Sequence, residues 1–264
     1  MSESPTYSTL LTIPGDGILT ITLNRQEVFN AVNAVMKKEL LDVFRNAEKD
    51  RSVRCVVLRG AGPKAFCAGQ DLKEYQSADV SMKRILEEGY NPIIRQMRTM
   101  EKPIIGMING VAAGAGFSLA LACDLRIMAD HAVLIQAFVR IGLVADSGSH
   151  WFLPRLVGTA KAFEYAATGR DIPAREAAEV GLVNRVVPSA ELESETMMLA
   201  HRLAEGPPKA IGMIKRTLER TWSMSLDELL AYEALLQDAA AKTNDHKEGV
   251  AAFLEKRRPV FTGT

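Results

Sequence analysis

The amino-acid sequence predicts an α/β core followed by an all-helical region. Up to about residue 190, short β-rich runs alternate with segments of helical periodicity, and beyond that point helical segments follow one another without a strand. The chain of 264 residues is also long enough to bury a large core. We therefore expect residues 1–195 to form the core and residues 196–264 to form a helical C-terminal region.

The chain begins with a predicted β-hairpin and a helix. Residues 7–13 and 18–23 are rich in apolar and β-branched side chains, and the Pro-Gly-Asp-Gly segment at 14–17 suits the turn between them. A helix over residues 34–50 follows, because Asn33 suits an N-cap and the apolar side chains after it recur at helical spacing.

Further cycles of strand, short loop and helix fill the middle of the chain. The predicted strands lie at residues 53–59, 104–108 and 124–129. The predicted helices lie at residues 81–100 and 158–168, with another beginning near residue 149. Asn109 and Gly110 are expected to turn the second of these strands directly into a helix.

The last part of the chain is predicted to be helical throughout. Four amphipathic segments follow one another there, at residues 191–205, 208–220, 226–241 and 246–256. Such a run of helices has two interpretations, a lid over the same chain or a surface that packs against other copies.

Charge and composition exclude several classes of partner. The 32 Lys and Arg residues balance the 32 Asp and Glu residues, so no basic excess indicates nucleic acid or an anionic membrane. Residues 104–121 are apolar but broken by glycines and an asparagine, and no uninterrupted apolar run is long enough to span a bilayer. We expect neither a nucleic-acid partner nor a membrane segment.

Cysteine use and the N-terminal residues indicate a cytoplasmic protein without a metal site. Cys55, Cys67 and Cys123 have neither C-x-x-C spacing nor paired histidines nearby, which argues against bound zinc. A sparse, odd number of cysteines suits a reducing compartment. Residues 1–6 lack the charged and apolar segments of a secretory signal.

Two glycine-containing loops carry the strongest functional signal. They are residues 64–72 (KAFCAGQDL) and residues 108–119 (INGVAAGAGFSL), the second of which leads into a helix. Small residues let a backbone approach a ligand closely, and a helix start has unpaired N–H groups. Two such amides pointing at one carbonyl oxygen would stabilise an enolate by roughly 3–4 kcal/mol per donor.

Other glycine motifs fit the sequence less well. Residues 60–65 satisfy the dinucleotide pattern G-x-G-x-x-A after a strand, but Pro63 and the residues after it do not open a helix. The sequence contains neither a Walker A motif nor a G-x-S-x-G nucleophile elbow. Simple tight turns remain an alternative for each glycine loop taken alone.

In combination, the motifs resemble the crotonase (enoyl-CoA hydratase/isomerase) family along nearly the whole chain. The matching segments are residues 23–31, 65–72, 109–116, 181–187 and 253–261. The resemblance implies a crotonase-like ββα spiral core and a C-terminal helical region for oligomerisation and closure of the active site. It also implies a coenzyme A thioester as substrate, no tightly bound cofactor, and a homotrimer or a dimer of trimers.

The resemblance also assigns candidate site residues. It implies that the backbone amides of Ala68 and Ala115 bind the thioester oxygen. It places adenine near Gln70 to Leu72 and the phosphates near Arg25 and a neighbouring subunit's Lys256. The full set expected to bind substrate or coenzyme A is Arg25, Ala65, Gln70, Asp71, Leu72, Gly114, Phe138, Trp151, Phe253 and Lys256. The helical region over residues 75–90 is expected to form much of the acyl pocket.

The side chains decide which reaction is expected. Family hydratases commonly use two glutamates, and the matching positions here hold Ser118 and Phe138, neither of which can do a carboxylate's acid–base work. Asp146 stands where family isomerases place an aspartate. Residues 142–155 most resemble the branch of isomerases that acts on ring acyl-CoA esters in phenylacetate degradation. We expect Asp146 to shuttle a proton, with its pKa raised by burial beside Phe138 and Trp151.

Several alternatives stay open. Asp146 could be an ordinary turn or cap residue before the next helix, since Asp-Ser-Gly is good turn chemistry. The chain could instead be an enoyl-CoA hydratase with an unusual carboxylate arrangement, or a family member that binds acyl-CoA without turnover. A thioester hydrolase is less favoured, because no water-activating pair is evident besides Asp146.

Overall fold

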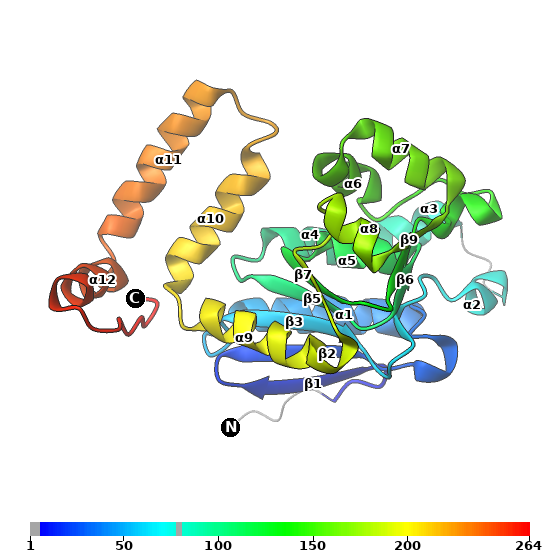
Figure 1. Cartoon of the computed structure of the whole chain (residues 1–264), viewed down its shortest axis with the longest axis horizontal. Helices are drawn as coiled ribbons and strands as arrows, with labels where there is room; N and C mark the ends of the chain where they lie inside the picture. Colours follow the sequence, from blue (N-terminus) through cyan, green and yellow to red (C-terminus); the bar gives the residue numbers. More distant parts are fainter. Residues whose placement is uncertain (1–5, 78–80) are drawn as a thin grey trace.

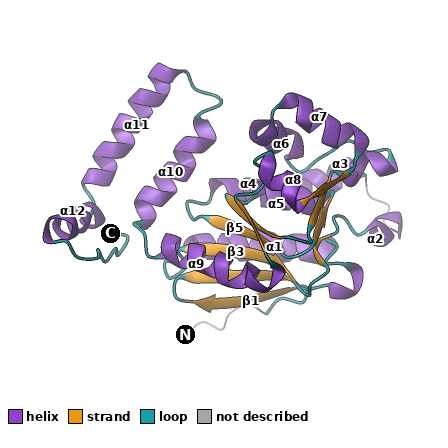
Figure 2. Ribbon diagram, viewed as in Figure 1, coloured by secondary structure: helices purple, strands orange, loops and turns teal. Residues whose placement is uncertain are grey.

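Two β-sheets form the centre of the protein in a computed structural model, which describes residues 6–77 and 81–264. The larger sheet has the order β1-β2-β3-β5-β7-β10, and the smaller one has the order β4-β6-β8-β9 (Figures 1 and 2). The larger sheet contains β1 (Leu10–Gly15), β2 (Ile18–Leu23), β3 (Cys55–Gly60), β5 (Ile104–Ile108), β7 (Leu125–Ala129) and β10 (Arg185–Val187). The smaller sheet contains β4 (Ala65–Cys67), β6 (Val111–Ala113), β8 (Val133–Ile135) and β9 (Asp171–Pro173).

The length of each connection determines whether neighbouring strands of the larger sheet run antiparallel or parallel. The tight turn between β1 and β2 makes this pair antiparallel, with Leu10 opposite Leu23. From β2 onward the larger sheet is parallel, and most connections between its strands carry helices. The sequences of β3 and β5 are almost wholly buried and apolar, as expected for strands covered on both faces.

Helices cover the sheets and continue into the C-terminal region. The helices of the core are α1 (Ala34–Lys49), α2 (Leu72–Ser77), α3 (Met82–Arg84), α4 (Asn91–Thr99), α5 (Ala115–Ala122), α6 (Ser149–Val157), α7 (Thr159–Thr168), α8 (Ala174–Glu179) and α9 (Leu192–Ala204). A π-helical turn, Ile85–Tyr90, joins α3 to α4, and 3₁₀ turns occupy Gln26–Val28, Ala137–Ile141 and Ser189–Glu191. The last three helices are α10 (Pro208–Arg220), α11 (Leu226–Ala241) and α12 (Asn244–Glu255).

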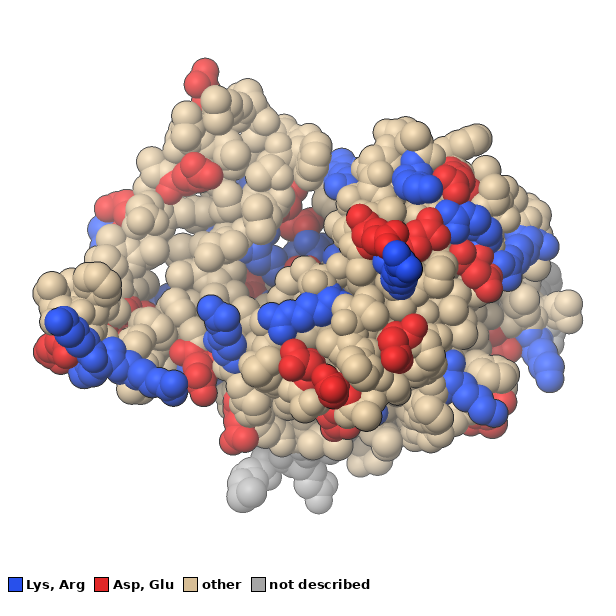
Figure 3. All heavy atoms as spheres, in the orientation of Figure 1, with Lys and Arg blue, Asp and Glu red and all other residues tan. Residues whose placement is uncertain are grey.

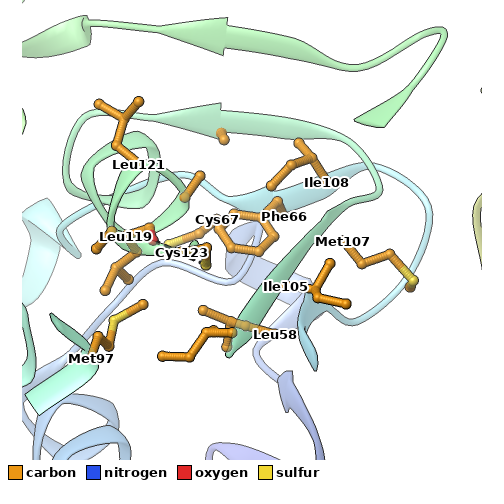
Figure 4. Close-up of a cluster of buried hydrophobic side chains, with 14 of the residues drawn as sticks. Leu58, Phe66, Cys67, Met97, Ile105, Met107, Ile108, Leu119, Leu121 and Cys123 are labelled. Atoms are coloured by element: carbon orange, nitrogen blue, oxygen red, sulfur yellow. Dashed lines mark hydrogen bonds between the residues drawn. The ribbon is translucent and has the colours of Figure 1, made fainter. Parts of the chain in front are cut away.

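The hydrophobic core holds both glycine loops in place. Every residue of α5 is buried, which fits a helix that is apolar on all sides. Figure 4 shows Leu119 of this helix beside Cys67 of β4. Both residues belong to one buried cluster that also contains Phe66 of β4 and Ile105 of β5. The strand within the first loop segment and the helix that begins in the second therefore share one packed cluster.

Much of the predicted secondary structure is confirmed, and one connection is wrong. The strand predicted at 104–108 and the helices predicted at 208–220 and 226–241 have the expected bounds. Asn33 caps α1 through its Oδ1, which accepts a hydrogen bond from Met36 N at 2.8 Å. Asn109 and Gly110 do not lead directly into a helix, because β6 comes first and pairs with β4 and β8.

The C-terminal helices α10–α12 stand away from the sheets, whereas α9 packs on β3, β5 and β7 (Figure 1). The predicted boundary at 195/196 lies within α9. An apolar cavity of about 690 Å³ separates α10 from α11 and is lined by residues such as Ile214, Leu218 and Leu230. In the described part of the chain, none of the helices combines the length and apolarity needed to cross a membrane.

A cluster of charged side chains joins α10 to the core. Asp124 Oδ1 accepts a hydrogen bond from Arg98 Nη1 at 2.9 Å, and its Oδ2 lies 2.8 Å from Lys215 Nζ. Lys215 Nζ also donates to Met97 O at 2.8 Å, and Arg98 Nε donates to Glu219 Oε1 at 2.9 Å. Burial lowers the pKa of Lys215, yet Asp124 and two carbonyl groups compensate the desolvated ammonium.

Replacing Lys215 with methionine is expected to destabilise the protein, because Asp124 would lose one of its two cationic partners within the core. Breaking a buried ion pair from one side costs about 3 kcal/mol or more. Urea denaturation would measure the loss against Lys209→Met, which removes an exposed lysine from the same helix. Equal unfolding midpoints for the two variants would contradict the anchoring role.

Candidate active site

The two glycine-containing loops meet backbone to backbone. A Cβ atom added at Gly69 would lie 2.8 Å from Ala113 O and 3.3 Å from Ala115 N. A Cβ at Gly116 would overlap the Cys67 carbonyl group and lie 2.8 Å from Cys67 Cβ. Because real Cβ atoms do not approach so closely, glycine at these two positions is what lets the loops touch.

The second loop presents the start of α5 at this junction. Gly114, the N-cap, has φ 52° and ψ −125° and provides no side-chain cap. Ser118 N donates to Gly114 O at 3.0 Å, so the amide of Ala115 lies in the first turn, where the helix offers no carbonyl partner. Its N–H is oriented for an acceptor outside the helix, and the helix dipole favours negative charge there.

A cavity of about 230 Å³ opens beside this junction. Gln70, Ala115 and Asp146 border it, and among the lining residues in the described part of the chain Asp146 is the single carboxylate. Its apolar walls come from Leu72, Met82, Tyr90, Phe138, Ile141 and Leu143. The expectation that residues 75–90 contribute is met by Met82 and Tyr90, while residues 78–80 lie outside the described part.

Asp146 is held from two sides. Its Oδ1 accepts a hydrogen bond from Ser147 Oγ at 2.8 Å, and its backbone carbonyl accepts from Ser118 Oγ and from Ser149 N, each at 3.0 Å. Burial raises the pKa of Asp146, although the Ser147 hydroxyl and the nearby His150 oppose the shift. The residue therefore has the geometry of a turn and also the environment of an acid–base group.

The sequence matches the enoyl-CoA hydratase/isomerase family over residues 14–264. The chain belongs to this family. It is 41% identical to a probable enoyl-CoA hydratase of Rhodobacter capsulatus, over 97% of this chain and 99% of that one. It is 40% identical to the 1,2-epoxyphenylacetyl-CoA isomerase of Escherichia coli, over 94% and 95% of the two chains.

Solved structures agree on the fold. A crystal structure of an enoyl-CoA hydratase from Bacillus anthracis superposes with a TM-score of 0.93 at 32% identity, covering 97% of this chain and all of that one. The α/β crotonase fold with C-terminal helices is thus confirmed. As a member of the enoyl-CoA hydratase/isomerase family, the protein is an acyl-CoA enzyme, and such enzymes typically need no further cofactor.

The Ala68 amide, which the sequence predicted to bind the thioester oxygen, has an acceptor within the protein. The amide of Ala68 already donates a hydrogen bond to Phe29 O at 3.0 Å, so it is not free to bind a thioester oxygen. The motif identified the right loop, but the partner of this amide comes from a segment almost forty residues earlier in the chain.

Among the residues that the structure describes, the amide two residues later, that of Gln70, donates no hydrogen bond. A parallel bridge links Gln70 to Val32, in which Val32 N donates to Gly69 O at 2.7 Å and Asp71 N donates to Val32 O at 3.0 Å. Successive groups of an extended backbone point to opposite sides. The Gln70 N–H is consequently directed away from Val32, toward the side on which Ala115 N lies.

Four more of the residues expected to bind substrate or coenzyme A lie in three different environments. Arg25 Nη1 lies 2.9 Å from Asp71 Oδ2 and also donates to Ala31 O at 2.7 Å, which joins the expected coenzyme A residues Arg25 and Asp71 in one ion pair. Ala65 is buried in β4, and its carbonyl accepts from the side chain of Asn30. Trp151 is not among the described residues that line the cavity; its ring packs against Arg155, 4.0 Å from the guanidinium carbon.

Within one chain, Phe253 and Lys256 lie far from the cavity. Phe253 lies in the last turn of α12 and Lys256 is its C-cap, and this helix is at the opposite end of the molecule from α2 (Figure 1). Phe253 is 83% exposed. Figure 3 shows acidic and basic side chains interspersed over one face of the molecule, including the region of α12.

Sequence reasoning missed Arg140, Ile141 and Leu143, which line the cavity. It also missed Lys37, whose side chain approaches Gln70 from α1. A lysine between buried apolar positions of a helix was the available signal, since Met36 and Leu40 on either side are fully buried.

Substituting Gly116 with alanine is expected to separate the two loops and weaken both stability and ligand binding. The new methyl group would have to displace the Cys67 carbonyl group, at a cost of about 2–3 kcal/mol for overpacking. Urea denaturation and calorimetric titration with a saturated acyl-CoA would measure the two effects. Gly15→Ala is the control, because a Cβ there meets nothing within 4 Å. Wild-type affinity in the Gly116 variant would contradict the proposed contact.

Asp146→Asn is expected to make the protein more stable at neutral pH. A carboxyl group whose pKa is raised by folding is protonated more in the native state, so its ionisation lowers stability as pH rises through this interval. The amide avoids that cost and can still accept from Ser147 Oγ. Calorimetry should find a higher Tm for the variant at pH about 7 and no difference at pH about 3, below the ordinary aspartate pKa. A lower Tm at neutral pH would be contrary evidence.

Proposed function

We propose that the protein is an isomerase of acyl-CoA thioesters in which Asp146 moves one proton between two carbon atoms of the substrate. The observation that carries this proposal is that Asp146 is the one carboxylate among the described residues that line the mostly apolar cavity beside the paired loops. A 1,3-proton shift requires one base that can also act as an acid, whereas hydration requires a water molecule to be positioned and activated.

The proposed reaction conserves the proton. Ionised Asp146 removes a proton from C2 of a 3-enoyl thioester, and the C–H electrons form a dienolate that extends over O1, C1, C2, C3 and C4. Protonated Asp146 then returns the proton to C4, which leaves the double bond between C2 and C3. A raised aspartate pKa favours the second step without preventing the first.

The dienolate oxygen is proposed to lie between the amides of Gln70 and Ala115. The support is the closeness of Gly69 to Ala115 N, the free first turn of α5, and the orientation of Gln70 N away from Val32. Removing one donor of such a pair typically costs about 10²–10³ in rate, or 2.7–4 kcal/mol. This arrangement replaces the expected pair of Ala68 and Ala115.

The acyl group is proposed to be apolar, unsaturated or ring-bearing. The walls formed by Tyr90, Phe138 and Leu143 suit a hydrocarbon or a ring. Similarity to the 1,2-epoxyphenylacetyl-CoA isomerase of Escherichia coli supports a ring acyl-CoA, as does the Asp146 segment.

Coenzyme A is proposed to extend along Gln70, Asp71 and Leu72 past Arg25, with Phe253 and Lys256 supplied by a neighbouring copy in a homotrimer or a dimer of trimers. The exposed apolar side chains of α11 and α12, including Leu235 at 71% and Leu254 at 73% exposure, support an assembly through the C-terminal helices. We place this assembly in the cytoplasm.

A substrate panel separates isomerisation from hydration. The wild-type enzyme should convert a 3-enoyl-CoA into the conjugated 2-enoyl-CoA, seen as increasing ultraviolet absorbance of the conjugated thioester. The variant Asp146→Asn should lower kcat by about 10²–10⁴-fold, because it removes the acid–base group. Asp130→Asn, which changes an exposed aspartate, serves as the control.

Three results would overturn the proposal in different directions. Water addition to a 2-enoyl-CoA that persists in the Asp146→Asn variant, without any isomerisation, would identify a hydratase. Release of free thiol would identify a hydrolase. Calorimetric binding of acyl-CoA esters without any reaction across the panel would identify a binding protein.

A further inference from the structure

The side chain of Gln70 is clamped by two buried groups, one from α1 and one from the cavity wall. Its Oε1 accepts a hydrogen bond from Lys37 Nζ at 3.0 Å and another from Tyr90 Oη at 3.0 Å. Lys37 is 8% exposed and Tyr90 is 2% exposed, so both donors are nearly removed from water. A buried ammonium and a buried hydroxyl thus converge on one amide oxygen.

The π-helical turn before α4 contains a glycine next to the lysine side chain. The helical segment between α3 and α4 widens into the π-helical turn Ile85–Tyr90, which also places Tyr90 at the cavity. Within this turn, a Cβ atom at Gly89 would lie 2.8 Å from Lys37 Cδ. The absence of a side chain at Gly89 therefore allows the lysine stem to pass, and Nζ reaches a point 4.9 Å from the centre of the Tyr90 ring.

Burying the Lys37 ammonium does not by itself stabilise the folded protein. Burial lowers the pKa of Lys37, because the ammonium has lost solvent that Gln70, Tyr90 and the nearby Glu74 replace only in part. Buried ionic groups are often no more stabilising than apolar side chains of the same size. A structural tie between α1 and the loop could have been made by an apolar contact, so the polar clamp calls for another explanation.

The clamp acts on the residue whose backbone borders the cavity. The backbone around Gln70 is fixed by the bridge to Val32, and its side chain is fixed by Lys37 and Tyr90, while Nε2 donates to Asp71 O at 3.2 Å. With these restraints in place, the peptide between Gly69 and Gln70 has little freedom to rotate. The remaining unfixed group is its N–H, on the side of Ala115 N.

We propose that Lys37 and Tyr90 are positioning residues that keep the Gln70 amide aimed at the thioester oxygen. This inference rests on the proposed role of that amide, not on which reaction follows. The two residues do not touch the substrate carbonyl; they act through the Gln70 side chain. Preorganised donors are effective because they need no rearrangement as charge develops on the oxygen.

Carbonyl polarisation in a bound, unreactive ligand tests the clamp without turnover. The infrared C=O stretch of a ¹³C-labelled saturated acyl-CoA should shift to lower frequency on binding to the wild-type protein. We expect a smaller shift in Lys37→Met, in Tyr90→Phe and in Gln70→Met, which keeps the backbone amide but removes the Oε1 acceptor. Lys49→Met, which changes an exposed lysine of the same helix, should leave the shift unchanged.

Kinetics and stability provide the second readout. Each clamp variant should lower kcat by about 10-fold, less than full loss of an oxyanion donor, with KM nearly unchanged. The double variant Lys37→Met with Gln70→Met should be no slower than either single one, because both break one contact. Lys37→Met should unfold at the same urea concentration as wild type or a higher one, since it removes a desolvated ammonium.

The outcomes separate this inference from the proposed reaction. A wild-type carbonyl shift and kcat in folded Lys37→Met and Tyr90→Phe variants would overturn the clamp and identify a purely structural contact. A reduced carbonyl shift in these variants would support the clamp even if the substrate panel identified a hydratase. Failure of Asp146→Asn to affect isomerisation would overturn the assigned base and leave the carbonyl result unaffected.

Discussion

The close approach of two backbone segments is the constraint on which the active site depends. Gly69 and Gly116 bring the loop after β4 against the start of α5 with no space for a methyl group at either position. This contact is possible because β4 and α5 share one packed cluster, in which Cys67 lies beside α5. Backbone amides are a stable choice for binding a developing oxyanion, since the surrounding core already determines their directions. Side chains are then left to decide the reaction.

The sequence predicted the large elements well and the smaller sheet poorly. The strand β5 and the helices α10 and α11 show clear periodicity over their whole length, and their bounds were predicted correctly. The strands β4, β6, β8 and β9 have three residues each, too few for any periodicity to appear. Their pairing also depends on contacts between distant segments, which a local pattern does not contain.

Part of the candidate site could likewise be predicted from the sequence, and part of it could not. The motifs located both loops, and the resemblance pointed to Asp146, which does border the cavity. The choice of amide within the first loop required knowing that Phe29 and Val32 already use the neighbouring backbone groups. Likewise, Lys37 resembled an ordinary polar residue of an amphipathic helix. Its meaning depends on Gly89 and on the π-helical turn, neither of which has a recognisable local signature at that spacing.

The contact between Ser118 and the Asp146 carbonyl restricts the side chain that position 118 can hold. Resemblance to family hydratases implies a glutamate at this buried position of α5, but here the serine hydroxyl holds the segment that carries the aspartate. A larger, charged side chain at position 118 would remove that hydrogen bond. A carboxylate at position 118 and the present hold on the Asp146 segment are therefore mutually exclusive, although the hydrogen bond from Ser149 N to Asp146 O would remain.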